Sequence, residues 1–379
     1  MAARGGSGAP HYQYPKGVRG SLELLKLQAD GKIPSPITRA AAKWEYKHAA
    51  GTPRPNFHHR RSGDAISIWA ANENFSYLVG MNRKLKDINA IDTSANGCYN
   101  PVTVKVDHNR NVWAGCQFNS TFNAGAAQEY DSNGNLTNTY NVACPTNIPA
   151  SQCVNLFSEG FDSAVNAKHV FANLVYYDAC DLSYNCQPGQ SGGFEYWKAG
   201  SPSSQPTLIS TSLPGMTVYG TGYFDVDAND NIYFWYDGCE NAYPYTCGYG
   251  LAEIESATGS SPTQIVLTQP NASAFWGGVS VSKQGTVLNV LEQNARTVTQ
   301  YALPWTGSPI GSLGPTQIPA IGVADPISGG FDRSDSKIII GDGYGWLDGI
   351  NAKTNAAKVR STAVCADGCG GAAFTPSDK

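Results

Sequence analysis

Short apolar runs separated by polar turns recur along this chain, and they fill equivalent places in a repeating unit. The unit consists of an apolar run, a polar turn, a β-branched run, a loop, and a third run that ends in a turn. Its middle run reads AISIWAAN from Ala65, NVWAGC from Asn111, HVFANLVYYD from His169, NIYFWYDG from Asn231, TVLNVLEQ from Thr286 and KIIIGDGYG from Lys337. Alternating runs of this length that stop at Gly, Asn or Ser predict strands joined by tight turns.

The repeated unit is split between the two ends of the chain. Successive units are spaced by roughly 45 to 60 residues, the period of propeller blades or solenoid repeats. The first run is missing before Ala65, where residues 58–61 read HHRR, and a matching run, GGAAFTPSDK, ends the chain at Lys379. Pairing these two segments closes a ring and removes its free edges. The sequence therefore predicts an all-β fold, a six-bladed β-propeller over residues 64–379 in which the C-terminal strand completes the N-terminal blade.

The turn between the first and second runs carries a family resemblance. It reads VDHNRNVWAG in one unit and VDANDNIYFW in another. On this pattern the chain from Asp64 to Lys379 resembles the NHL-type and gluconolactonase-like six-bladed propellers. The resemblance implies the fold and leaves the function open, because such propellers serve as hydrolases, lyases, dehydrogenases and binding platforms. Residues 1–63 have few apolar positions and predict an irregular extension, a tail or surface wrap.

The composition agrees with a turn-rich β protein and narrows the partners. The chain has 379 residues with 41 Gly, 20 Tyr and 8 Trp, and only 15% of its residues are charged. A net charge of -4 argues against a nucleic-acid partner, which calls for a basic stripe. No stretch approaches the roughly 18 apolar residues of a membrane-spanning helix.

The ten cysteines predict disulfides on one face of the ring. In a blade of strands a to d, the b–c and d–a loops emerge on the same face, and the cysteines fall at that face in close pairs. The expected local disulfides are Cys98 with Cys116, Cys144 with Cys153, Cys180 with Cys186, Cys239 with Cys247, and Cys365 with Cys369. Zinc is the competing interpretation, although no C-x-x-C pair occurs.

Disulfides of this kind persist outside the cytosol, which predicts a secreted, periplasmic or cell-surface protein. A signal peptide is not present in this chain, because Met1 to His59 contains no charged segment followed by an apolar one. Either the signal peptide has been removed or missed in defining the chain, or the inferred compartment is wrong, and we favour the first interpretation.

The candidates for chemistry are sparse. A metal-dependent hydrolase or lyase on this fold would hold its ion at the mouth of the central channel, and the carboxylates placed there are Glu159, Asp162, Asp225 and Asp332. These could hold calcium; the alternative is that such acids cap turns or bond neighbouring backbone. The turn acids Asp107, Asp131, Asp227 and Asp335 are expected to bond their own backbone. No nucleophile elbow, haem attachment, P-loop or dinucleotide fingerprint occurs, so no catalytic residue and no cofactor is assigned.

Aromatic residues crowd two adjacent b–c loops. The expected binding residues are Tyr176, Tyr177, Tyr184, Trp235, Tyr236, Tyr243, Tyr245 and Tyr249. Tyr and Trp give rigid amphipathic contact area that suits sugars or protein partners, and the alternative is that these rings shield the blade tops. The sequence thus favours an extracytoplasmic binding module for a protein or glycan ligand that contacts this face and not the opposite one. A metal-dependent hydrolase or lyase, and a structural subunit of a surface assembly, are the alternatives.

Overall fold

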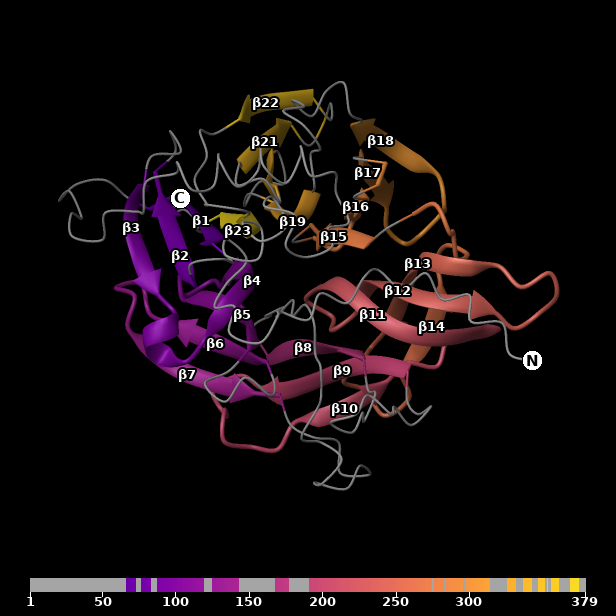
Figure 1. Cartoon of the computed structure of the whole chain (residues 1–379), viewed down its shortest axis with the longest axis horizontal. Coiled ribbons are helices and arrows are strands. Elements are labelled where there is room, and N and C mark those ends of the chain that lie inside the picture. Colours follow the sequence, from indigo (N-terminus) through magenta and orange to yellow (C-terminus); the bar gives the residue numbers. More distant parts are fainter. Residues whose placement is uncertain are drawn as a thin grey trace, which may run out of the picture.

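The computed structural model describes much of the chain between Ile66 and Phe374. The described residues are 66–72, 76–82, 87–118, 125–142, 168–176, 191–274, 276–282, 284–292, 294–295, 297–313, 326–331, 337–342, 347–351, 353, 356–360 and 369–374. They form strands β1 to β23 and one short 3-10 helix, η1 (Ser94–Asn96). Their sheets stand in a ring (Figure 1), so the protein is an all-β propeller, as the sequence predicts.

Five sheets of the ring have four antiparallel strands each. Their strands, from the centre of the ring outward, are β23 (Cys369–Phe374), β1 (Ile68–Asn72), β2 (Tyr77–Met81) and β3 (Asp87–Asp92); β4 (Tyr99–Val106), β5 (Val112–Phe118), β6 (Ala126–Tyr130) and β7 (Leu136–Asn141); β11 (Met216–Val226), β12 (Ile232–Glu240), β13 (Cys247–Glu255) and β14 (Thr263–Val266); β15 (Trp276–Val281), β16 (Val287–Glu292), β17 (Thr297–Ala302) and β18 (Pro309–Leu313); and β19 (Pro326–Phe331), β20 (Lys337–Asp342), β21 (Leu347–Asn351) and β22 (Ala356–Arg360).

The remaining sheet has three strands, β8 (His169–Tyr176), β9 (Ser191–Lys198) and β10 (Thr207–Ser210). The part of the chain that the structure describes therefore holds five complete blades and not the six that the sequence predicts. The run expected as the innermost strand of this sheet, EGFDSAVNAK from Glu159, lies outside the described residues except for its last position.

The ring closes through strands from opposite ends of the chain, which confirms the split unit. Strand β23 pairs antiparallel with β1, with Phe374 opposite Ile68 and Ala372 opposite Ala70. Figure 1 shows β23 between β1 and the strands of the last sheet. The C-terminal strand is thus the innermost strand of the N-terminal blade, as the missing first run predicts.

The core lies in layers between neighbouring sheets, because successive side chains of a strand point to opposite faces and both faces are covered. The largest apolar cluster joins three sheets and contains Phe194, Phe224 and Phe234. The Phe194 ring centroid is 5.1 Å from that of Phe224 and 4.9 Å from that of Phe234, in edge-to-face geometry. Because the core is divided between blade interfaces, its stability depends on the ring staying closed.

Tight turns join strands a and b and, in one blade, strands c and d, and their acids bond their own backbone as the sequence predicts. The Asp107 carboxylate accepts the backbone N–H groups of Asn109 and Asn111, each at 2.8 Å. Asp131 and Asp227 bind their own loops in the same way. The Asn135 side chain, by donating to Asp131, lowers the pKa of that carboxyl. Asp335 lies outside the described residues.

Within the described residues, no helix is long and apolar enough to cross a membrane.

Candidate functional site

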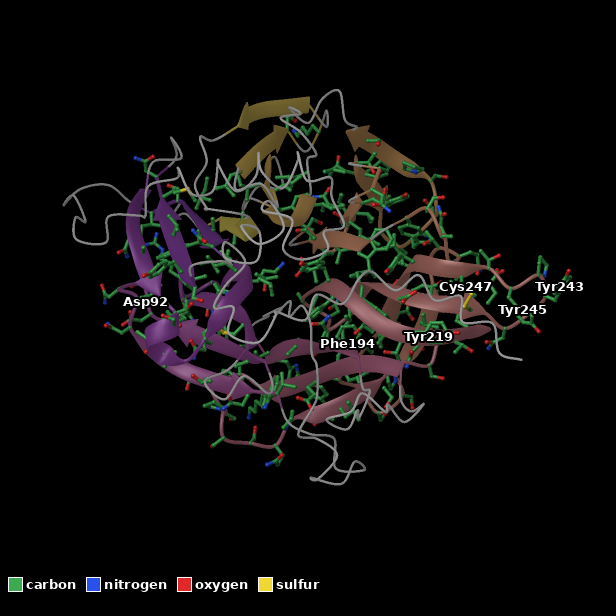
Figure 2. The ribbon with its side chains drawn as sticks, viewed as in Figure 1. Asp92, Phe194, Tyr219, Tyr243, Tyr245 and Cys247 are labelled. Carbon is green, nitrogen blue, oxygen red and sulfur yellow. A yellow bond between two sulfur atoms is a disulfide. The ribbon has the colours of Figure 1, made fainter. Side chains whose placement is uncertain are left out.

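The most exposed aromatic side chains of the described chain stand at the tip of the hairpin between β12 and β13. Tyr243 is 86% exposed and Tyr245 is 68% exposed. Their ring centroids lie 6.1 Å apart and the ring planes are nearly perpendicular, at 87°. Figure 2 shows both side chains at the outer end of this hairpin, beyond the ring of sheets. These are two of the eight residues that the sequence marks for binding, and the structure brings them together.

The hairpin tip, which we define as residues 241–246, is held by a disulfide at its base. Cys239 and Cys247 are opposite each other in the ladder, and their sulfur atoms are bonded. The Glu240 N–H donates to the Thr246 carbonyl at 2.9 Å, which closes the tip from inside. On its outer side, the Asn241 N–H donates to the Gly215 carbonyl at 2.9 Å, and Thr217 Oγ1 donates to Asn241 Oδ1 at 2.7 Å. The tip is therefore anchored to β11 as well as to its own strands.

The hairpin stem packs closely against the next segment of the chain. A Cβ at Gly250 would lie 2.6 Å from the ring of Tyr236, whose hydroxyl donates to the Thr268 carbonyl at 2.9 Å. At Gly248 the backbone has φ +143°, and a Cβ would lie 2.4 Å from the Asn271 backbone. Only glycine fits these two positions, so the stem holds a fixed direction and the exposed tyrosines project from it.

Three of the predicted binding residues belong instead to the core, which corrects the sequence prediction. Trp235, Tyr236 and Tyr249 are buried in the apolar cluster that joins the neighbouring sheets. The reason is that β12 continues to Glu240 and β13 begins at Cys247, so these residues lie in the ladder and not in a loop. Burial raises the pKa of Tyr236, as expected for a phenol within the packed stem.

The other three predicted aromatic residues are not placed. Tyr176 ends β8, and its side chain lies outside the described residues, as do Tyr177 and Tyr184 entirely. A role in binding stays a prediction for all three.

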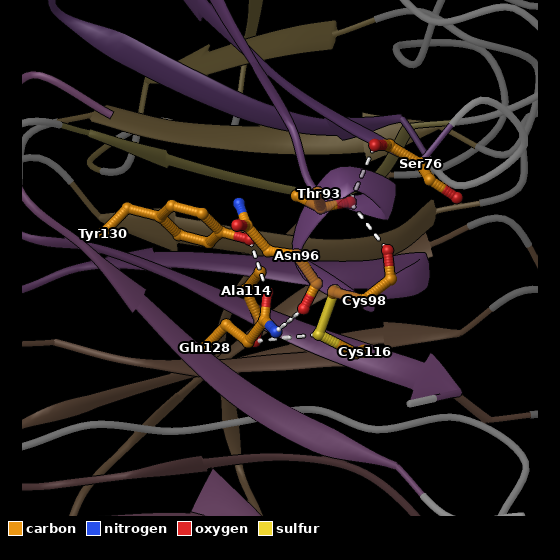
Figure 3. Close-up of a disulfide and its surroundings, with 8 residues drawn as sticks. All are labelled: Ser76, Thr93, Asn96, Cys98, Ala114, Cys116, Gln128 and Tyr130. Atoms are coloured by element: carbon orange, nitrogen blue, oxygen red, sulfur yellow. Dashed lines mark hydrogen bonds between the residues drawn. A yellow bond between two sulfur atoms is a disulfide. The ribbon is translucent and has the colours of Figure 1, made fainter. Parts of the chain in front are cut away.

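The second described disulfide is buried where two blades meet. Cys98 and Cys116 are bonded, with a Cα–Cα distance of 5.3 Å, and tie the start of β4 to β5 (Figure 3). Thr93 Oγ1 lies 2.7 Å from the Ser76 carbonyl oxygen and 3.0 Å from that of Cys98. This network links the β1–β2 loop of one blade to the first strand of the next.

A polar chain on the same connection fixes the short helix η1. Gln128 Nε2 donates to the Asn96 carbonyl at 2.8 Å, and the Tyr130 hydroxyl donates to Gln128 Oε1 at 2.5 Å (Figure 3). Burial raises the pKa of Tyr130, which keeps its hydroxyl available as a donor. We assign this disulfide region to structure, because its polar groups are buried and turned toward one another.

Two of the five predicted disulfides are confirmed, and both lie at the ends of strands b. The described part of the chain contains no free cysteine. Cys144, Cys153, Cys180, Cys186 and Cys365 lie outside the described residues, and of Cys369 only the backbone is described, in β23. Those three pairings stay predictions.

Lys105 and Asp225 form an ion pair at the centre of the ring. Lys105 Nζ of β4 lies 3.3 Å from Asp225 Oδ1 of β11, and both side chains are mostly buried. Asp225 Oδ2 also accepts the Val281 N–H of the next blade at 2.9 Å. This carboxylate, one of the four considered for a metal, thus links the innermost strands of three sheets. The other three, Glu159, Asp162 and Asp332, lie outside the described residues.

A hollow at the opposite ends of the strands was not foreseen from the sequence. Its volume is about 600 Å³, and it lies where β8 begins and β9 ends. The basic side chains of its lining are Lys168, His169 and Lys198. His169 Nδ1 lies 3.0 Å from Asp230 Oδ2, which belongs to the a–b turn of the neighbouring blade. In the sequence, the sign of this contact is Asp230 itself, an acid at the fourth position of the DANDN turn. In the structure its backbone has φ +62°.

Comparison with known proteins gives the fold and no family. No family model and no curated protein matches the chain. A hypothetical selenium-binding protein from Sulfolobus tokodaii has a TM-score of 0.54 at 8% identity, over 88% of this chain and 83% of that chain. A chain from a nidogen–laminin complex has a TM-score of 0.51 at 10% identity, over 82% of this chain and 98% of that chain.

A gluconolactonase from Xanthomonas campestris is also similar, with a TM-score of 0.44 at 10% identity, over 69% of this chain and 76% of that chain. The propeller fold that the predicted resemblance implies is confirmed by the ring of sheets in this chain itself. At these identities the similarities show the fold alone, and the function must be argued from this chain's own residues.

Proposed function

We propose that this protein is an extracytoplasmic binding module that contacts a protein partner through the hairpin tip carrying Tyr243 and Tyr245. The observation that carries the proposal is the exposure of these two rings, 86% and 68%, on a tip held by a disulfide and by bonds to β11. Exposed tyrosines on a braced loop lose little conformational entropy when they bind. They also supply the kind of anchor that dominates protein interfaces.

The shape of the tip favours a protein partner over a glycan. Aromatic rings that bind sugars usually offer a flat face, whereas Tyr243 and Tyr245 meet at 87° and form an angular knob. A projecting knob fits a pocket on another protein, where its rings become fully desolvated. One similar structure comes from a nidogen–laminin complex, so the fold occurs within a protein assembly.

The extracytoplasmic part of the proposal is supported by the disulfides. Cys98–Cys116 and Cys239–Cys247 each join neighbouring antiparallel segments of one blade, and such bonds persist where the environment is oxidising. The three further pairs expected from the sequence would bring the number of disulfides to five.

We further propose that the ring has six blades over residues 64–379, with β8–β10 as the third. Support comes from the neighbouring packing of its strands: Asn173 of β8 donates from Nδ2 to the Gly222 carbonyl of β11 at 2.8 Å. The run from Glu159 then supplies the missing inner strand, and residues 1–63 form an extension outside the ring.

The proposal is tested by screening the protein against extracellular protein ectodomains and a glycan array, followed by affinity measurement for every hit. Truncation of one anchor tyrosine, Tyr243→Ala or Tyr245→Ala, is expected to weaken a genuine partner about 30-fold, because an anchor contributes about 2 kcal/mol. The matched controls are Leu136→Ala and Ile310→Ala, which truncate exposed apolar side chains on β7 and β18, in other blades than the tip.

Loss of affinity in the two tip variants with little change in the controls supports the proposal. A ligand whose affinity survives both tip substitutions shows that the tip is not the contact surface. If the screen finds a glycan whose binding depends on the tip and finds no protein partner, the proposal of a protein partner is refuted. The tip variants should have the same melting temperature as the parent protein, since neither tyrosine is packed in the core.

A further inference from the structure

The hollow beside β8 and β9 is lined by side chains that suit a charged ligand. Besides Lys168, His169 and Lys198, the lining includes Ser204 and Gln205 of the β9–β10 connection and Thr207 at the start of β10. Tyr196 contributes an aromatic wall. The volume of about 600 Å³ lies within the range of small-molecule sites.

The imidazole of His169 is held in place from two sides. Its Nδ1 lies 3.0 Å from Asp230 Oδ2, and its ring meets that of Tyr196 edge to face, with centroids 5.3 Å apart. Asp230 is in turn fixed, because its Oδ2 accepts the Thr258 hydroxyl at 2.7 Å. The carboxylate is 6% exposed and the imidazole 22% exposed, so the acid lies behind the ring and the ring lies nearer to solvent.

The described lining of the hollow is basic. Lys168 and Lys198 contribute to it, and the lining contributed by the described residues contains no acid. The nearby acid, Asp230, does not line the hollow and is engaged by His169 and Thr258. A positively charged hollow with polar side chains around it attracts an oxyanion, which lysines bind by charge-assisted hydrogen bonds.

We infer that this hollow is a binding site for a small hydroxylated molecule that carries one carboxylate or phosphate group. Lys168 and Lys198 hold the anionic group, with His169 oriented by Asp230 beside them. Ser204, Gln205 and Thr207 offer hydroxyl and amide groups to the rest of the ligand. The site lies at the strand ends opposite to the hairpin tip, so it is independent of the proposed protein contact.

The test uses the full chain and two simple anions, inorganic phosphate and acetate, at constant ionic strength. Calorimetry gives the affinity, and NMR of the histidine ring protons shows whether binding occurs beside His169. Lys198→Ala is expected to weaken binding about fivefold, as for loss of one partly exposed charge-assisted contact. Lys353→Ala, an exposed lysine on the β21–β22 turn, is the matched control for the change in net charge.

Binding that perturbs His169 and depends on Lys198 but not on Lys353 supports the site. Binding of phosphate and not acetate identifies a phosphorylated ligand, and the reverse identifies a carboxylate. If neither anion perturbs His169, or if both lysine variants weaken binding equally, the site does not exist. Substitution of Tyr243 and Tyr245 should leave anion binding unchanged, which separates this result from the test of the proposed function.

Discussion

Removal of residues 372–379 should open the ring, because these residues include half of the strand that closes it, β23. Three of the five residue pairs between β23 and β1 would disappear, those of Ile68, Trp69 and Ala70. A truncation at this point retains Cys369. The β1 edge, which β23 covers in the intact ring, would then lie open to water.

The free-energy cost of this truncation follows from the hydrogen bonds and the apolar burial that it removes. About two to three backbone hydrogen bonds at roughly 1 kcal/mol each give about 2.5 kcal/mol. The buried methyl groups of Ala372 and Ala373 add about 0.8 kcal/mol each. The total of roughly 4 kcal/mol is a large share of the 5–15 kcal/mol that is about the usual stability of a domain. At about 2 °C per kcal/mol, the melting temperature should fall by about 8 °C.

Calorimetry of the truncated chain checks the fall in melting temperature, and hydrogen exchange checks its location. The amides of β1 should lose protection, whereas those of β12, on the other side of the ring, should lose less. A chain that lacks only residues 375–379, which lie beyond β23, is the matched control. Equal melting temperatures for the two truncated chains would refute closure through the termini.

Three further predictions concern the hairpin, a turn and a buried acid. Replacing Cys239 and Cys247 by Ser should lower the free energy of unfolding by about 2 to 3 kcal/mol at most. In hydrogen exchange, the amides of the hairpin should lose protection before those of the rest of the ring. Gly134→Ala should lower the free energy of unfolding, measured by urea titration, more than Gly200→Ala does. Both glycines have φ near +80°, but only at Gly134 would a Cβ lie 3.1 Å from a β3 side chain. Burial raises the pKa of Glu253 above 4.5, so the folded chain holds that proton more tightly and stability falls as the pH rises from 4.5 through the folded pKa. Glu253→Gln should flatten that fall, and an unchanged pH profile would contradict it.

The features predicted correctly from the sequence are those that depend on neighbouring residues or on an internal repeat. Asp107 accepts hydrogen bonds from its own loop because the D-x-N-x-N spacing places the amides within reach. Closure through β23 follows from one missing run and its match at the C-terminus. The pairing of Cys239 with Cys247 follows from their short separation in a hairpin.

The features that the sequence did not predict depend on how far strands extend and on contacts between blades. The sequence predicts a loop at Trp235 and Tyr249 because Gly and Asp residues near them interrupt the apolar pattern. In the structure the β12–β13 ladder continues past both residues. His169 and Asp230 are 61 residues apart and meet only because adjacent blades pack side by side. Lys105 reaches Asp225 across the centre of the ring, an interaction that no local pattern contains.

The central claim, that the hairpin tip is the contact surface, is tested most directly by photo-crosslinking to the partner found in the screen. A photoreactive phenylalanine placed at Tyr243 should form cross-links to that partner in high yield. The same group at Ile310, an exposed position on β18, should form few, because it lies on another blade away from the tip. Cross-links from Ile310 and none from Tyr243 would contradict the account and place the partner elsewhere on the ring.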